Sequence, residues 1–136
     1  MTINESLRTW IEQYPAIEIV VMTDQLESMI GSYGLYKTPT QNIIPFVDGS
    51  NLITQTYQFL CRQSAMLNDE RIDNNEWFQA FEYWAREQDI AGNLPVLDTG
   101  LEAQGIEIGT TYYMQEQVED KAIYQLSISI TYVERG

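Results

Sequence analysis

Histidine is absent from the 136 residues of the chain. Its absence removes the commonest general base, the Ser-His and Cys-His nucleophile pairs, and the usual zinc and iron ligand sets. The phosphate-binding loops GxxxxGK[ST] and GxGxxG are missing too, since Gly31-Ser32-Tyr33-Gly34 lacks their remaining glycine and lysine positions. Most hydrolase and acyltransferase mechanisms are thereby excluded. We predict a protein that is not an enzyme and that holds no cofactor.

Cysteine and long apolar runs are scarce. The single Cys61 has no partner for an internal disulfide and falls in an apolar run, so we expect a small core residue in a reducing environment. No stretch approaches the roughly 18 apolar residues of a membrane helix, and the first ten residues lack the features of a secretion signal. We expect a protein made in the cytoplasm with no membrane association.

Basic residues are few and scattered. Seven Lys and Arg stand against twenty Asp and Glu, which gives a formal charge of −13 and an isoelectric point near 4.1. Phosphate backbones and anionic membranes attract clustered positive charge, which this chain does not have. Sequence-specific nucleic-acid binding is therefore excluded.

The residues that are present favour one folded domain. A hydrophobic fraction of 44% and an aromatic fraction of 12% are too high for a disordered chain. The length suits a single core, and no repeat, low-complexity tract or linker divides the sequence. We predict one domain over residues 1–136.

Two helices are indicated by caps and helical periodicity. Thr2 and Glu5 have capping-box spacing before apolar residues that share one helical face, and Pro15 ends this helix. Asp73 and Glu76 repeat the spacing before an aromatic stripe. That stripe comprises Trp77, Phe81, Trp84 and Ala85, with Phe78 beside it and Tyr83 off the apolar face. The second helix ends before Asn93-Leu94-Pro95.

Strands are indicated by apolar alternation. The predicted strands are residues 17–22, 42–47 and 52–65, one containing Ile106, Ile108, Tyr112 and Met114, and a last one from Ala122 to Tyr132. Asp48-Gly49-Ser50 joins the second and third as a hairpin, whereas Gly31, Gly34 and Pro39 predict turn and loop. The result is an α+β fold: a mainly antiparallel sheet of four to five strands with two helices packed on one face.

Two acidic clusters could hold a cation or supply paired carboxylates. They are Asp69, Glu70 and Asp73, and Glu116, Glu119 and Asp120. Neither has the ligand spacing and glycine of a calcium loop, and most such clusters are solvated. We predict no metal site and no catalytic residue, with a carboxylate or metal-dependent enzyme as the weakest hypothesis.

A contact surface is the better candidate for function. Tyr112 and Tyr113 are strand neighbours that point to opposite faces, so one of them is expected at the surface. Unpaired strand edges also allow copies of a protein to associate, and the segment 42–47 is our choice for such an edge. The predicted oligomer interface comprises Ile43, Ile44, Phe46, Val47 and Tyr113.

Five segments together resemble a family. They are Glu5-Ser6-Leu7-Arg8-Thr9-Trp10, Val47-Asp48-Gly49-Ser50 with its long strand, the helix with Trp84, Leu94-Pro95, and the terminal strand from Tyr124-Gln125 to Tyr132. The chain resembles, over nearly its whole length, the minor structural proteins of tailed bacteriophages of Gram-positive hosts, of the tail-terminator or head-to-tail joining type. Where that family has a basic residue and Gln after the turn, this chain has Thr54-Gln55 and lacks the charge.

The resemblance implies a tail-terminator-like fold and a homo-oligomeric ring, usually a hexamer, that caps the tail tube. Its partners would be the tail tube protein and the head-tail connector proteins, and DNA would pass through the ring. The protein would be assembled in the host cytoplasm and located in the virion. The high acidity fits a channel that repels DNA, and equally a protein in which the charge only provides solubility.

An alternative from a different class remains open. An acidic monomeric protein-binding module or inhibitor would present its carboxylates to a basic partner. Binding of that kind weakens strongly with added salt, whereas a ring held by apolar contacts does not.

Overall fold

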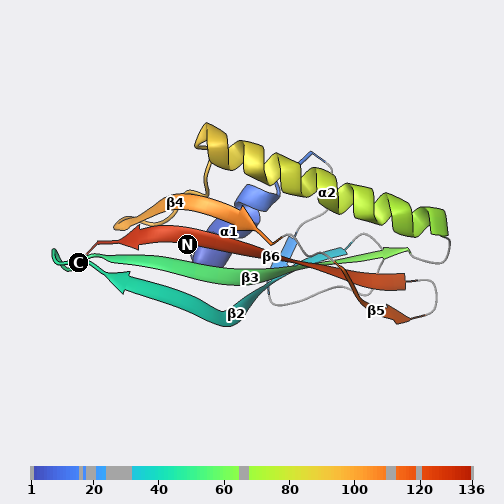
Figure 1. Cartoon of the computed structure of the whole chain (residues 1–136), viewed down its shortest axis with the longest axis horizontal. Coiled ribbons are helices and arrows are strands. Elements are labelled where there is room, and N and C mark those ends of the chain that lie inside the picture. Colours follow the sequence, from blue (N-terminus) through green and yellow to red (C-terminus); the bar gives the residue numbers. More distant parts are fainter. Residues whose placement is uncertain are drawn as a thin grey trace.

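The computed structural model describes residues 2–15, 17, 21–23, 32–64, 68–109, 113–118 and 121–135, and it confirms the α+β class. Within these residues each of two helices is followed by three strands (Figure 1). In chain order they are α1 (Ile3–Ile11), β1 (Val21–Thr23), β2 (Ser32–Pro45), β3 (Asn51–Ser64), α2 (Asn68–Ala91), β4 (Leu101–Ile108), β5 (Tyr113–Val118) and β6 (Lys121–Glu134).

The strands form one sheet in the order β1-β2-β3-β6-β4, antiparallel except for the parallel pair β1–β2. β5 also pairs with β6. Because β3 occupies one side of β6 along its whole length, β4 and β5 share the other side: β4 lies next to residues 128–134 and β5 next to residues 121–125. The sheet is therefore at most five strands wide, as the sequence predicts.

Local signals mark the start of α1 and the end of α2, and two boundaries were predicted wrongly: α1 ends at Ile11 rather than at Pro15, and α2 starts before Asp73. The Thr2 hydroxyl accepts a hydrogen bond from the Glu5 amide at 3.1 Å, which is the predicted cap of α1. α2 starts at Asn68, five residues before the predicted cap at Asp73. No Gly or Pro separates these positions, so the helix extends upstream. Gly92, with φ of +80°, follows its last residue.

An aromatic layer joins the helices to one face of the sheet. The ring centroids of Trp10 and Trp84 lie 5.0 Å apart, and those of Phe81 and Phe59 on β3 lie 5.4 Å apart. The Trp10 indole N–H also donates to the Asn93 carbonyl at 2.7 Å, which ties α1 to the end of α2. Cys61 is fully buried in the same core, as predicted. Such rings bury large apolar areas and orient the packed elements.

The loop predicted around Gly34 and Pro39 is wrong, because both residues belong to β2, while Gly31 lies outside the described residues. Gly34 is buried opposite Leu60. Pro39 falls where the register between β2 and β3 shifts, so its missing N–H costs no ladder hydrogen bond. Turn-forming residues are compatible with a strand when a bulge accommodates them.

The alternation through Ile106, Ile108 and Met114 predicted one strand, but the structure has two. The β4 ladder ends with Ile108 opposite Ile128, and the β5 ladder resumes with Tyr113 opposite Gln125. Tyr112 lies outside the described residues. Apolar periodicity continues across the break and predicted a single strand, although Gly109, directly after β4, is a local signal for the interruption.

Gln55 stabilises the irregular part of the hairpin. Residues 38–40 of β2 lie opposite Thr56 alone, which leaves carbonyl groups without their usual ladder partners. The Gln55 side chain, 2% exposed, donates from Nε2 to the carbonyls of Thr38, Thr40 and Thr56 at 2.9, 3.2 and 2.9 Å. One buried amide thus takes the place of the missing ladder bonds.

We expect Gln55→Ala to lower the free energy of unfolding by about 1 to 3 kcal/mol, because the partly buried carbonyls of Thr38 and Thr40 lose this donor. Chemical denaturation followed by far-UV circular dichroism measures the loss. Gln58→Ala is the control, since Gln58 lies on the same strand but on the opposite, half-exposed face. Equal losses in both variants would contradict this role for Gln55.

Candidate functional site

The predicted interface residues gather at the end of the β2–β3 hairpin. Ile43, Ile44, Phe46 and Val47, called the hairpin tip from here on, are 51%, 47%, 44% and 108% exposed. Tyr113 lies on β5, with its side chain outside the described part of the structure. Four exposed large apolar side chains on five consecutive positions form a patch, and patches of this kind mark contact sites.

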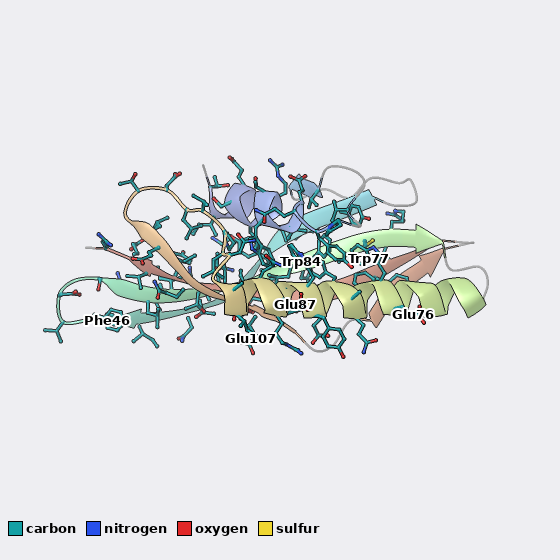
Figure 2. All side chains as sticks on the ribbon, turned by 90° about the horizontal axis from the view of Figure 1, so that it is seen from above. Phe46, Glu76, Trp77, Trp84, Glu87 and Glu107 are labelled. Atoms are coloured by element: carbon teal, nitrogen blue, oxygen red, sulfur yellow. The ribbon has the colours of Figure 1, made fainter. Side chains whose placement is uncertain are left out.

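The hairpin tip lies away from the core. Figure 2 shows Phe46 at the far end of the hairpin, beyond the end of α2. Within the described residues, β1 pairs only with Tyr33–Leu35, and no other strand follows the outer edge of β2 toward the tip. Pro45 and the bulge at residues 38–40 limit strand addition along this edge. The side chains of the tip are thus its main means of contact.

Hydrogen bonds hold the turn in one shape. The Phe46 amide donates to the Ser50 carbonyl at 2.8 Å, and the Gly49 amide donates to the Phe46 carbonyl at 3.1 Å. Gly49 has φ of +92°, a conformation that favours glycine. The Asp48 carboxylate accepts from the Ser50 hydroxyl at 2.6 Å and the Ser50 amide at 2.9 Å. The flanking Phe46 and Val47 are presented by an ordered turn.

A second exposed apolar group lies on and after α2, and sequence reasoning missed most of it. Tyr83 and Ile90, called the α2 stripe from here on, are 52% and 81% exposed, and Val96 beyond the helix is 82% exposed. Tyr83 and Ile90 are seven residues apart and so share one face of the helix. The Arg86 guanidinium lies 5.7 Å from the centre of the Tyr83 ring. In the sequence, this exposed face was indicated by the i, i+7 spacing of Tyr83 and Ile90 on the side of the helix opposite the aromatic stripe.

Charge is distributed unevenly between these two surfaces. Residues 32–64, which form the hairpin, include one acidic residue, Asp48, against Lys37 and Arg62, a formal charge of +1. α2 has seven acidic residues against Arg71 and Arg86, a formal charge of −5. At the tip itself the charged residue is Asp48, because Lys37 and Arg62 lie farther down the hairpin, opposite Tyr57 and Ser32.

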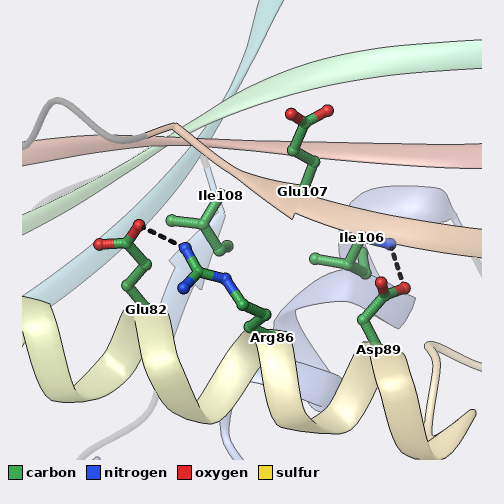
Figure 3. A pocket seen from close by; sticks show the side chains of 6 residues that line it. All are labelled: Glu82, Arg86, Asp89, Ile106, Glu107 and Ile108. Atoms are coloured by element: carbon green, nitrogen blue, oxygen red, sulfur yellow. Dashed lines mark hydrogen bonds and ion pairs between the residues drawn. The ribbon is translucent and has the colours of Figure 1, made fainter.

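A groove lies between α2 and β4, and several of the side chains that line it interact with one another or with the β4 backbone (Figure 3). Its volume is about 270 Å³, and its lining comprises Glu82, Arg86, Asp89, Ile106, Glu107 and Ile108. Arg86 pairs with Glu82 at 3.0 Å, and Asp89 accepts the Ile106 amide at 3.0 Å. These polar groups satisfy one another and attach α2 to the outer edge of β4.

The acidic clusters considered in the sequence fall largely outside what the structure describes. Asp69, Glu70, Asp73 and Glu116 lie on α2 and β5 without described side chains, and Glu119 and Asp120 lie outside the described residues. Among the described side chains, no three carboxylate or thiol groups are close enough to hold a metal ion. None of the described helices is both long and apolar enough to span a membrane.

Comparison with protein-family models and with curated proteins gives no match to this chain. The exposed side chains of the hairpin tip and of the α2 stripe, together with the acidity of α2, are the structural features that bear on function.

We expect the pKa of Asp48 to lie below its ordinary value of 3.8, because hydrogen bonds from the side chain and backbone of Ser50 stabilise the carboxylate. A depressed pKa contributes stability above pH 3.8 that is lost as the pH falls through the lower, folded-state pKa. Carboxyl chemical shifts recorded by NMR during an acid titration measure this pKa. Ser50→Ala should raise it, and an unchanged pKa in that variant would contradict the assignment.

Proposed function

We propose that this protein is a non-enzymatic virion structural protein of a tailed bacteriophage, a tail terminator. In this proposal copies form a ring, a hexamer in the family it resembles, that caps the tail tube and contacts the head connector. The ring assembles in the host cytoplasm and remains in the virion.

The observation that carries the proposal is the exposed hairpin tip. Ile43, Ile44, Phe46 and Val47 expose large apolar side chains on a hairpin that extends beyond the helices. Burying such side chains contributes about 25 cal/mol per Å² of apolar area removed from water, which favours association. An ordered turn with little negative charge reduces both the entropic and the electrostatic cost of that association.

Absent catalytic chemistry agrees with an assembly role. The chain has no histidine, and in the groove at α2 the Glu82, Arg86 and Asp89 side chains are paired within the protein. The resemblance to phage minor structural proteins supplies the ring and its partners. An acidic ring would repel the DNA that passes through it, so transfer of DNA from head to tail would not be slowed by binding.

An acidic binding module is the second candidate, and the charge of α2 favours it. A formal charge of −5 on one helix suits a basic partner surface. Such a protein would act as a monomer, and its binding would weaken steeply as the NaCl concentration rises. A ring held by apolar contacts would keep its mass under the same conditions.

We expect Ile44→Glu and Phe46→Glu each to weaken self-association by about 30-fold or more, because each places a charge in an apolar contact. Size-exclusion chromatography with light scattering, over a range of protein concentrations, measures the effect. Both side chains are exposed, so the free energy of unfolding should change by less than about 0.5 kcal/mol.

Thr99→Glu is the matched control for these variants. It adds the same charge at an exposed position in the turn before β4, at the same end of the sheet but three strands across from β2. Retained assembly in Thr99→Glu together with loss in the tip variants supports the tip as the interface. Equal behaviour of all three variants would contradict it.

Deletion of the encoding gene from its phage or prophage tests the biological role. We expect overlong tails separate from filled heads when particle production is induced and the products are imaged by negative-stain electron microscopy. Normal-length unattached tails would assign the protein to head joining instead. Ordinary infectious particles would refute a virion role and favour the acidic binding module.

A further inference from the structure

We propose that Asp48 is a site of spontaneous isomerisation to isoaspartate, and that two hydrogen bonds from Ser50 restrain this conversion in the folded protein. The reaction needs no enzyme, metal or cofactor, and it is independent of the function proposed above. Ser50 is a positioning residue for this chemistry, because it holds the carboxylate of Asp48 and takes no part in the bonds that change.

The turn at the end of the hairpin has the sequence in which this reaction is fastest. A glycine after aspartate has no Cβ to hinder attack by its own amide nitrogen. Asp48-Gly49 is the one Asp-Gly pair of the chain, and no Asn-Gly pair occurs. Both residues are exposed, and a Cβ built onto Gly49 would meet no atom within 4 Å. Packing therefore does not prevent the backbone of this turn from rearranging.

The chemical step joins the two residues of this pair. The Gly49 amide nitrogen attacks Cγ of the protonated Asp48 carboxyl, an N–Cγ bond forms, and one carboxyl oxygen leaves as water together with the amide hydrogen and the carboxyl hydrogen. Water then adds to the former main-chain carbonyl carbon of Asp48, and the bond from that carbon to the Gly49 nitrogen breaks. The peptide link now runs through Cβ and Cγ of Asp48, the former main-chain carbonyl is a free carboxylate, and the mass of the chain is unchanged.

Hydrogen bonds in the turn oppose this step at both reacting groups. The Gly49 amide donates to the Phe46 carbonyl at 3.1 Å, so its hydrogen must be released from that carbonyl before the nitrogen can attack. The Asp48 carboxylate accepts from the Ser50 hydroxyl at 2.6 Å and from the Ser50 amide at 2.9 Å. These two bonds stabilise the ionised carboxylate, whereas the group that loses an oxygen as water is the protonated carboxyl. Ser50 therefore raises the barrier to isomerisation.

Conversion would change the shape of the hairpin tip. Isoaspartate adds one atom to the main chain between Val47 and Gly49, and it consumes the side-chain carboxylate that Ser50 holds. The hydrogen bond from the Phe46 amide to the Ser50 carbonyl, 2.8 Å long, closes a turn of fixed length, so a longer main chain disturbs it. The exposed side chains of Phe46 and Val47 would then be presented in a different arrangement.

Ageing of the folded and the unfolded chain at neutral pH tests the proposal. Trypsin cleavage after Lys37 and Arg62 releases residues 38–62, in which Asp48 is the sole aspartate. The isomerised peptide keeps its mass and is separated by chromatography, and fragmentation in a mass spectrometer locates the isoaspartate. We expect folded Ser50→Ala to isomerise about tenfold faster than folded wild type, the effect of losing one hydrogen bond to a charged group. In denaturant the two chains should isomerise at equal rates, because these bonds are absent there.

Two further variants separate the role of the hydroxyl from a general loss of structure. Ser50→Thr keeps the hydroxyl and should isomerise at the wild-type rate. Asp48→Glu should give far less isomer, because its longer side chain cannot close the five-membered ring. Far-UV circular dichroism checks that each variant is folded.

The rates decide between the outcomes. Slow isomerisation of folded wild type and Ser50→Thr, with a faster folded Ser50→Ala, supports the proposal. Equal rates in all three folded chains overturn the role of Ser50. If Ser50→Ala does not fold, the comparison of folded with unfolded wild type still decides, since equal rates there show that the turn gives no protection. Absence of isoaspartate at Asp48 in denaturant overturns the site itself.

Discussion

The unbroken pairing of β3 with β6 is the constraint on which the rest of the molecule depends. Residues 51–64 pair with residues 121–134 without a register shift. Alternate residues of both strands therefore form one apolar face, which both helices cover, while β2 joins one side and β4 and β5 the other. A slip of one residue would turn every core side chain of β3 to the opposite face.

The hairpin extends further than the helices that cover it. Near Leu35 and Phe59 its inner face belongs to the core, whereas near Ile43 and Phe46 the apolar side chains reach solvent. The bulge bridged by Gln55 lies between these two parts. Core packing and surface contact are thus served by one continuous pair of strands, and the buried amide maintains the pairing where the ladder is irregular.

The distribution of charge gives the two borders of the molecule different roles. Residues 32–64 carry almost no negative charge in a chain whose formal charge is −13, whereas α2 carries much of it. Copies of such an acidic chain repel one another at long range, so the association that we propose would depend on the exposed apolar side chains of the tip.

The sequence by itself determined the elements with strong local signals: the cap at Thr2, the hairpin turn at Asp48-Gly49-Ser50, and the alternation of β6. It also singled out Ile43, Ile44, Phe46 and Val47, because they follow a strand pattern next to that turn. It failed at the start of α2, which no glycine or proline marks, at Pro39, which lies in a bulge within β2, and at the break between β4 and β5, where Gly109 was not used as a signal. Tertiary structure alone decided which apolar residues remain exposed, because exposure of Ile90 or Phe46 depends on how far the helices extend over the sheet.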